Sequence, residues 1–146
     1  MFKVISFEGI NPELISVCHQ IRQAVFVEEQ GIDENLEIDD KDEEAKHYLL
    51  FENETAVGTG RWRKTQHGIK LERYAVLPSW RNKGVGKKIL EAMLQDVLAL
   101  KEPIYLNAQH TAVNFYLQNG FSLQGDPFYE AEILHFKMTY PTPYHS

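Results

Sequence analysis

Apolar residues recur along two stretches of the chain at the spacing of an amphipathic helix. The first helix is predicted to start at Asn11 and Pro12 and to end near Gln30, where Gly31 stops it. The second spans about 84–100, with apolar residues at steps of three or four: Val85, Ile89, Met93, Val97 and Leu100. Each helix would bury this face against another element.

The other apolar segments have the composition and spacing of β-strands. Strands are predicted at residues 2–7, 47–52, 56–64, 69–77, 103–107 and 131–140, and another begins at Phe121. A short helix is predicted from about Ala112 to Asn119, with Gly120 at its C-terminal end. This order of elements predicts one α+β domain over residues 1–146. Its sheet should be mixed, mostly antiparallel and flanked by helices.

The segment before the long helix carries the clearest chemical signal. A strand ending in AVLP leads into a basic loop of six residues: Arg81, Asn82, Lys83, Gly84, Val85 and Gly86. A helix N-terminus presents free N–H groups and the positive end of the helix dipole, which together suit a phosphate. The glycines let the backbone approach a ligand closely, and Lys87 and Lys88 add positive charge. The loop is therefore predicted to hold a pyrophosphate.

The spacing of this loop excludes two common phosphate-binding motifs. It lacks both the first glycine of G-x-x-x-x-G-K-[ST] and the third glycine and βαβ unit of G-x-G-x-x-G. Its pattern, R-x-x-G-x-G after a strand, resembles the acetyl-coenzyme A loop of the GNAT N-acetyltransferase superfamily. A second stretch, AVNFYLQNGF, is similar to the superfamily pattern A-x-x-x-Y-x-x-x-G-F, with Ala112, Tyr116, Gly120 and Phe121 in the matching places. For the hexamer alone, the alternative is a helix-entry loop with a basic rim.

A finer resemblance is carried by residues 22–30, RQAVFVEEQ. They match the R-x-x-V-F-V-x-E-Q segment of a group of small bacterial GNAT proteins, to which the glyphosate N-acetyltransferases are a related branch. In that branch a histidine three residues before a methionine, on the last strand, is implicated as the base. His135 stands three residues before Met138. That branch usually has proline before the histidine, whereas this chain has Leu134.

The resemblance implies a GNAT fold with acetyl-CoA as the acyl donor. Main-chain groups of Ala75 and Val76 would meet the pantetheine arm and the acetyl carbonyl. Gln109 occupies a place where many GNAT proteins have Asn and the glyphosate branch has Arg, so a fixed positive charge is missing and the inference of a glyphosate-like or otherwise anionic substrate is weakened. The expected cofactor-binding residues are Ala75, Val76, Arg81, Asn82, Lys83, Gly84, Val85, Gly86, Lys87 and Gln109.

The resemblance also implies direct attack of an amine on the thioester, and the sequence shows no obvious activated nucleophile. Tyr116 matches the family tyrosine near the sulfur and is the expected general acid; its alternative role is core packing. His135 is the expected base, because an imidazole titrates near neutral pH. Its alternative is a structural histidine, and Glu72 and His110 are rival bases. Strand alternation would place Glu72 and Tyr74 on one face of the sheet.

The net charge of −6 argues against nucleic-acid binding, which needs a basic face. Acidic residues crowd residues 28–44, relieved only by Lys41. This segment is predicted to be either a solvated, mobile loop or an electrostatic funnel for a cationic amine. A metal site is not expected, because no D-x-[DN]-x-[DN]-G pattern occurs. Arg22, Arg61 and Arg73 would either bind a substrate carboxylate or phosphate or pair with these acids.

The remaining expectations concern compartment and partners. Cys18 is the single cysteine, which excludes an internal disulfide, and its apolar helical setting predicts a buried thiol. No apolar run could span a bilayer and no signal peptide is evident, so a cytoplasmic location is expected. The expected partner is a small-molecule amine, without nucleic acid or membrane. A protein acceptor and a homodimer stay open, as do a non-catalytic acyl-CoA sensor and an interaction protein that uses residues 28–44.

Overall fold

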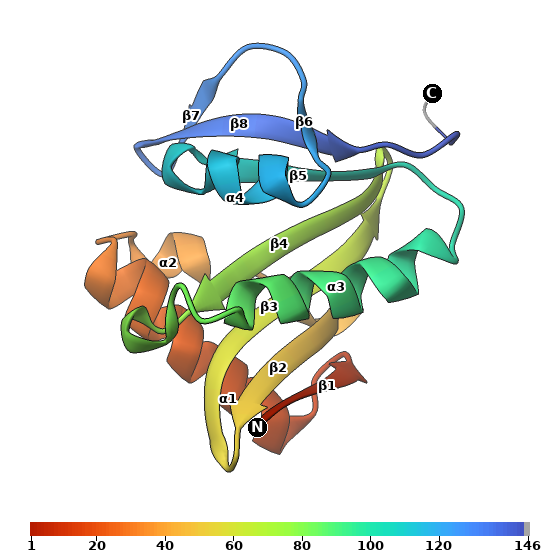
Figure 1. The fold of residues 1–146 in the computed structure, drawn as a ribbon. Helices are drawn as coiled ribbons and strands as arrows, with labels where there is room; N and C mark the ends of the chain where they lie inside the picture. The colour runs from red at the N-terminus through yellow and green to blue at the C-terminus, as the bar shows by residue number, and fades with distance from the viewer. Residues whose placement is uncertain (145–146) are drawn as a thin grey trace.

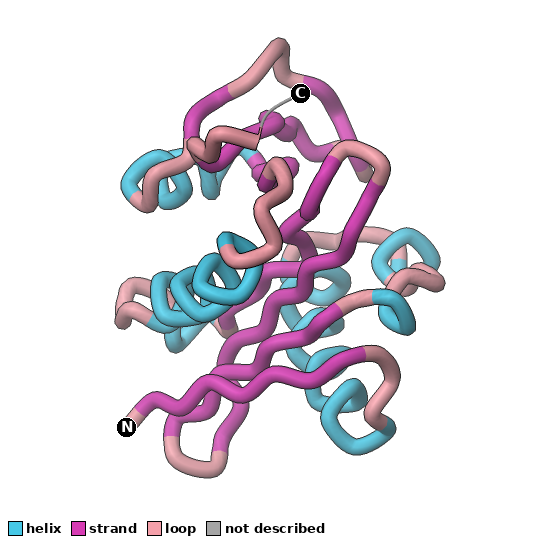
Figure 2. The backbone as a smooth tube through the Cα atoms, turned by 90° about the vertical axis from the view of Figure 1, so that its right-hand side faces the viewer, coloured by secondary structure: helices cyan, strands magenta, loops and turns pink. Residues whose placement is uncertain are grey.

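The apolar segments form one twisted sheet with helices on both faces (Figures 1 and 2). This is a computed structural model, and it describes residues 1–144. The strands are β1 (Phe2–Glu8), β2 (Lys46–Glu52), β3 (Thr55–Thr65), β4 (Gly68–Val76), β5 (Ile104–Gln109), β6 (Ser122–Leu123), β7 (Phe128–Glu130) and β8 (Ile133–Tyr140). Their order is β1-β2-β3-β4-β5-β8-β6, with β7 paired to β8. Within the described residues, β4 and β5 form the parallel pair and the other neighbours are antiparallel. The predicted α+β class and mixed sheet are confirmed.

Helices cover the sheet on both sides. The α-helices are α1 (Pro12–Arg22), α2 (Glu34–Glu37), α3 (Val85–Leu98) and α4 (Val113–Gln118). A π-helix, η1 (Gln23–Glu29), continues α1, and 3₁₀ turns lie at η2 (Asp42–Glu44), η3 (Pro78–Trp80) and η4 (His110–Ala112). The side chain of Asn11 caps α1 by accepting from the N–H of Leu14. The predicted first helix is therefore present over its whole length, but its second part is π-helical.

The core lies on both faces of the sheet. Against α3, the side chains of Ile89, Met93 and Val97 are fully buried. The helix packs closely here because β3 has glycine at position 58, where a Cβ would come within 2.7 Å of Ile89. Against α1, Cys18 is fully buried, as expected, and burial raises the pKa of its thiol to about 11.

Strands β4 and β5 diverge, and this divergence positions the site. They pair only from Ile69 with Ile104 to Leu71 with Leu106, and no further β4–β5 pair occurs among the described residues. Figure 1 shows the two strands spreading apart toward the end where η1 and α2 lie. Beyond Leu71, the edge of β4 that faces β5 is thus left without a strand partner.

A bulge in β4 overturns the predicted alternation of Glu72 and Tyr74. The register against β3 shifts between Thr59 and Arg61, and Arg73 has a φ of 51°. The extra residue leaves Glu72 paired with Arg61 on the face of α1, while Tyr74 packs against α3. The prediction that both side chains share a face is therefore wrong, because a strict period of two fails at a bulge.

The end of the chain also differs from its prediction. Residues Ala131 and Glu132 were expected to begin the last strand, but they form the turn between β7 and β8. Their φ values are 50° and 63°, which is the left-handed region. The turn sets Glu130 opposite Ile133 and brings Phe128 opposite His135.

Candidate active site

A cavity of about 930 Å³ opens where β4 and β5 diverge. Its walls come from β4, β5, the start of α3, α4, the η1–α2 segment and the turn between β7 and β8. In Figure 1 the orange η1–α2 segment, the loop before α3 and the β7–β8 turn all lie toward the left side of the molecule. Residues from positions 25 to 135 therefore meet around one space.

The predicted pyrophosphate loop forms one wall of this cavity. Asn82 and Gly84 have φ values of 61° and 82°, so the loop turns twice through the left-handed region before α3 begins. The first helical bond of α3 runs from the N–H of Lys88 to the carbonyl of Gly84, so the preceding N–H groups have no acceptor within the helix. Such a run of free N–H groups is an anion-binding arrangement.

Glycine is required at position 86 for packing. A Cβ there would lie 2.9 Å from the hydroxyl of Tyr74 and 3.4 Å from the ring of Phe115. The Tyr74 hydroxyl donates a hydrogen bond to the carbonyl of Gly86, and this links β4 to the first turn of α3. The sequence gives no sign that Tyr74 belongs to the site, because the bulge that turns it toward the cavity has no local signal.

Not every predicted cofactor residue faces the cavity. Ala75, Val76, Arg81, Asn82, Gly84, Gly86, Lys87 and Gln109 line it. The side chain of Val85 is instead buried in the core, and the ammonium of Lys83 stands 5.1 Å from the centre of the Trp80 ring. For these two residues only main-chain groups are placed to serve a ligand. The carbonyl of Val76 already accepts from Nε of Arg81, at 3.0 Å.

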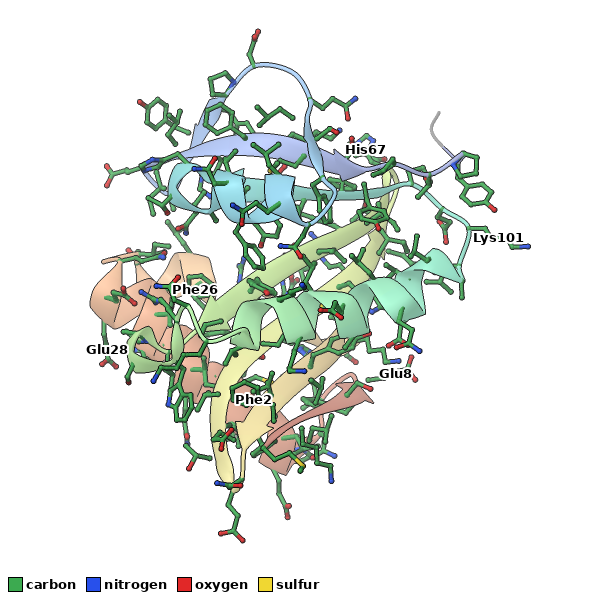
Figure 3. All side chains as sticks on the ribbon, in the orientation of Figure 1. Phe2, Glu8, Phe26, Glu28, His67 and Lys101 are labelled. Carbon is green, nitrogen blue, oxygen red and sulfur yellow. The ribbon has the colours of Figure 1, made fainter. Side chains whose placement is uncertain are left out.

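Arg81 is held by a carboxylate from the opposite wall. Its two terminal nitrogens donate to the two oxygens of Glu29, each at 2.6 Å. Figure 3 labels Phe26 and Glu28, which lie on η1 at the side of the molecule where the loop before α3 also runs. Hydrogen bonding from Arg81 lowers the pKa of Glu29. Glu29 belongs to the quoted R-x-x-V-F-V-x-E-Q segment, but that pattern gave no sign of this pairing.

The cavity also contains the predicted acid, Tyr116. Its side chain is 7% exposed, and it packs edge-on against Phe115 and Phe121. The Tyr116 hydroxyl has no hydrogen-bond partner among the described residues. Since no side-chain oxygen there is both fully buried and unpaired, this oxygen must be accessible, and it faces the cavity. Burial raises the pKa of Tyr116 above its ordinary value. The hydroxyl is therefore protonated at neutral pH.

His135, the predicted base, lines the same cavity. Its Nδ1 lies 2.7 Å from the carbonyl of Ile133, and because a carbonyl only accepts, Nδ1 carries the hydrogen. The neutral ring then has its lone pair on Nε2. The nearest carboxylate oxygen, from Glu130, is 3.9 Å from Nε2, and Phe128 stacks on the ring. The ring is thus fixed in the tautomer that can accept a proton.

The rival bases are less suited. Glu72 lines the cavity, but its carboxylate pairs with Arg61, Arg63 and Lys70. Burial alone would raise the pKa of Glu72, yet these cations outweigh it and hold the pKa below its usual value. His110 is exposed at the end of β5 and does not line the cavity.

Part of the acidic segment forms an ion-pair network, while its other acids are exposed. Three of its acids, Glu37, Asp39 and Asp42, turn inward to arginines that come from other elements. Arg61 is 1% exposed and bonds to Asp39, Asp42 and Glu72. Burial raises the pKa of Asp39, but Arg61 and Arg73 more than offset it and lower the pKa to about 2. The prediction of a wholly solvated, mobile loop is wrong for these three residues.

Besides Arg61, two further arginines, Arg22 and Arg73, are predicted to bind substrate or to pair with the acids, and they occupy different positions. Arg22 is 1% exposed, pairs with Glu37 and Asp42, and does not line the cavity, which corresponds to the ion-pairing alternative. Arg73 does line it, and its guanidinium donates to the carbonyl of Glu37 and to a carboxylate oxygen of Asp39 at 3.1 Å. The expectation that Arg22 contacts substrate is not supported, since its donors are taken up by buried acids.

Gln109 takes part in a contact across the cavity. Its amide and that of Gln30 exchange two hydrogen bonds, of 2.8 and 3.1 Å. The pair joins the end of η1 to the end of β5. Residues 79 positions apart are brought together by the fold, so this contact had no sequence signal.

Known proteins with similar sequences identify the family to which this chain belongs. The "Acetyltransferase (GNAT) domain" family matches residues 10–141. An uncharacterised N-acetyltransferase of Bacillus subtilis strain 168, YjcF, is 36% identical over 130 residues, covering 88% of this chain and 93% of its own. The chain belongs to the GNAT acetyltransferase family. Its reaction is therefore acyl transfer from an acyl-CoA.

Solved structures agree with the GNAT fold. The crystal structure of Escherichia coli ElaA has a TM-score of 0.86 at 25% identity and covers 97% of this chain and 100% of its own. A crystal structure titled as an acyl-CoA N-acyltransferase from Pseudomonas aeruginosa reaches a TM-score of 0.86 at 22% identity, with the same coverage. At that identity the second likeness concerns the fold alone.

Residues 1–144 contain neither a membrane-spanning helix nor a cluster of metal ligands. None of the helices within residues 1–144 has the length and apolar content needed to cross a bilayer. Over the same residues, His, Cys, Asp and Glu side chains do not gather in any group of three or more that could hold a metal ion.

Proposed function

We propose that this GNAT protein transfers an acetyl group from acetyl-CoA to the primary amine of a small molecule. One observation carries the proposal. A single cavity is lined by a helix N-terminus suited to pyrophosphate, an unpaired edge of β4, the hydroxyl of Tyr116 and the imidazole of His135. Binding groups for the donor and a proton donor and acceptor for the chemistry thus face the same space.

The donor is proposed to lie along two features of this cavity. Its pyrophosphate binds the free N–H groups at the start of α3, with Arg81 and Lys87 adding charge. Its pantetheine arm runs beside the unpaired edge of β4, where main-chain groups near Ala75 are free of β5. An extended arm can add to a strand edge in this way, much as a peptide does.

The chemical step is a direct transfer in a ternary complex. The amine nitrogen attacks the thioester carbon with its lone pair, the C–N bond forms and the C–S bond breaks. Before the attack, Nε2 of His135 takes one proton from the ammonium form of the amine, and this proton then leaves to solvent. The leaving sulfur takes the proton of the Tyr116 hydroxyl, and the surplus proton on the nitrogen restores that hydroxyl through water. Tyr116 is suited to its role because its hydroxyl faces the cavity and, with a pKa above the ordinary value, carries its proton at neutral pH.

The proposal is tested by thiol release from acetyl-CoA with an amine panel, together with His135→Ala and the control His67→Ala, which alters an exposed turn. We expect His135→Ala to reduce turnover about 10²-fold near neutral pH and less at alkaline pH, where more amine is already neutral. His67→Ala should match wild type. An equal loss for His135→Ala at both pH values would remove His135 from the role of base.

The alternatives have less support. A non-catalytic acyl-CoA sensor has no use for a cavity-facing tyrosine hydroxyl or a histidine held in one tautomer. An interaction protein that uses residues 28–44 has less support because three of the acids there, Glu37, Asp39 and Asp42, pair with arginines of the same chain. Binding of acetyl-CoA without turnover of any amine would favour the sensor.

A further inference from the structure

We assign the acceptor end of the cavity to lining residues of the η1–α2 segment and of the β7–β8 hairpin, because these do not belong to the loop before α3. It is lined by Phe26, Ile32, Leu36, Glu37, Glu130 and His135. The loop before α3, which suits the pyrophosphate, is built from other elements of the cavity wall. The side chains at the acceptor end are therefore the ones that would meet the body of the amine.

The cations near this end already have carboxylate partners. The guanidinium of Arg73 lies 3.1 Å from Asp39 and 3.4 Å from Glu37, and the ammonium of Lys70 lies 3.3 Å from Glu72. An acceptor with a carboxylate or phosphate group would have to displace one of these acids. Burying such a group without a partner is strongly unfavourable, so a glyphosate-like acceptor does not fit.

One carboxylate at this end has a different setting. Glu130 is 54% exposed, lines the cavity, and has no lysine or arginine partner among residues 1–144. Its Oε2 lies 3.9 Å from Nε2 of His135. An ammonium group drawn to Glu130 would therefore arrive beside the atom that is to take its proton, and the resulting imidazolium would face a negative charge.

The η1–α2 segment also supplies apolar surface to the cavity. Phe26, Ile32 and Leu36 contribute side chains to the cavity, and Leu36 is 60% exposed. Exposed apolar surface inside a cavity gains from being covered by an apolar ligand. A strongly polar acceptor would not cover this apolar surface and would forgo that gain.

We propose that the acceptor is a primary amine attached to an apolar aliphatic or aromatic body that carries no acidic group. This inference depends on the proposed acetyl transfer and specifies its substrate class. The apolar surface receives the body of the acceptor, and Glu130 draws the amine to His135. Glu130 is a specificity-determining residue in this scheme.

The test compares matched amines with the full-length protein and acetyl-CoA. The pairs are hexylamine with 6-aminohexanoate and phenethylamine with phenylalanine, each differing in one carboxylate; spermidine and glucosamine are amines without an apolar body. We expect kcat/KM to be about tenfold or more higher for each amine that lacks the carboxylate. Hexylamine should also exceed spermidine and glucosamine.

Two variants with matched controls locate the effect. Glu130→Gln should raise KM for hexylamine about fivefold to tenfold without changing KM for acetyl-CoA, whereas Glu132→Gln, in the same turn, should have no such effect. Leu36→Ser should weaken the preference for hexylamine over glucosamine, while Leu123→Ser, which alters an exposed leucine on β6, should not.

The outcomes separate this inference from the proposed function. Preferred turnover of the carboxylated amines, or of spermidine or glucosamine, would overturn the acceptor class and leave acetyl transfer intact. Binding of acetyl-CoA without acetylation of any amine would overturn the proposed function and the acceptor class with it.

Discussion

The loop at residues 81–86 and the acidic segment at 28–44 are both charged surface stretches in the sequence, yet the fold uses them differently. The loop acts mainly through its backbone, with left-handed turns at Asn82 and Gly84 and free N–H groups at the start of α3. The acidic segment acts through side chains that pair with Arg22, Arg61 and Arg73. The residues that shape the backbone of a loop can be recognised from the local sequence, whereas the partner of a charged side chain cannot.

The two segments therefore contribute to different ends of the cavity. The loop supplies the positive, glycine-containing end of the cavity, where the CoA pyrophosphate is proposed to bind. The acidic segment neutralises the arginines around the other end and holds α2 against β4 through Arg73. Among the hydrogen bonds and ion pairs of residues 1–144, the pair of Glu29 with Arg81 links the two regions.

The largest effect is expected from breaking the network at Arg61. Arg61→Met would leave the buried carboxylates of Asp42 and Glu72 short of a partner, so we expect a loss of about 3–5 kcal/mol in the free energy of unfolding. Urea denaturation measures it. The control Lys64→Met removes an exposed pair with Glu102 and should cost less than about 1 kcal/mol. Equal small losses would mean that the network adds little to stability.

The pH dependence of stability gives a second test of the ion-pair network. The folded pKa of Asp39 is about 2, below the ordinary aspartate value, so its contribution is complete above about pH 4 and is lost as pH falls toward 2. The pKa of Asp42 is also lowered. Burial also lowers the pKa of His47, so the unfolded chain binds a proton first, and stability should already decline gently below about pH 6.5.

Urea midpoints across this range give the measurement. We expect a shallow decline below about pH 6.5 and a steep one between about pH 4 and 2, where the depressed aspartates titrate. A midpoint that stays constant down to pH ~2 would contradict the assignment of Asp39 and Asp42 as ionised, stabilising groups.

The smallest effect is expected where the two regions touch. Glu29→Gln would release Arg81 toward the pyrophosphate, and because the pair is partly exposed, we expect acetyl-CoA to bind about twofold to fivefold more tightly. Glu28→Gln makes the same change of charge at the neighbouring residue and serves as the control. Calorimetric titration with acetyl-CoA measures both. Weaker binding of Glu29→Gln would show that the Glu29–Arg81 contact organises the loop rather than competing with the ligand.

The sequence predicted what depends on local pattern. The amphipathic spacing of α3, the cap at Asn11 and the glycine-containing loop all lie where expected, and so do Tyr116 and His135 at the cavity. It could not predict the bulge at Arg73, because arginine has no preference for a positive φ. The partners of Arg22 and the contact between Gln30 and Gln109 join distant residues, and only the fold brings them together.

The most direct test of the proposed chemistry compares Tyr116→Phe with Tyr105→Phe, which alters a tyrosine outside the cavity. Acetylation of an amine by acetyl-CoA is followed as thiol release, and acetyl-CoA affinity is measured in parallel. If Tyr116 protonates the leaving sulfur, Tyr116→Phe should lower kcat about 10²-fold with acetyl-CoA affinity nearly unchanged, and Tyr105→Phe should match wild type. Unchanged kcat for Tyr116→Phe would contradict the role of Tyr116 as the acid.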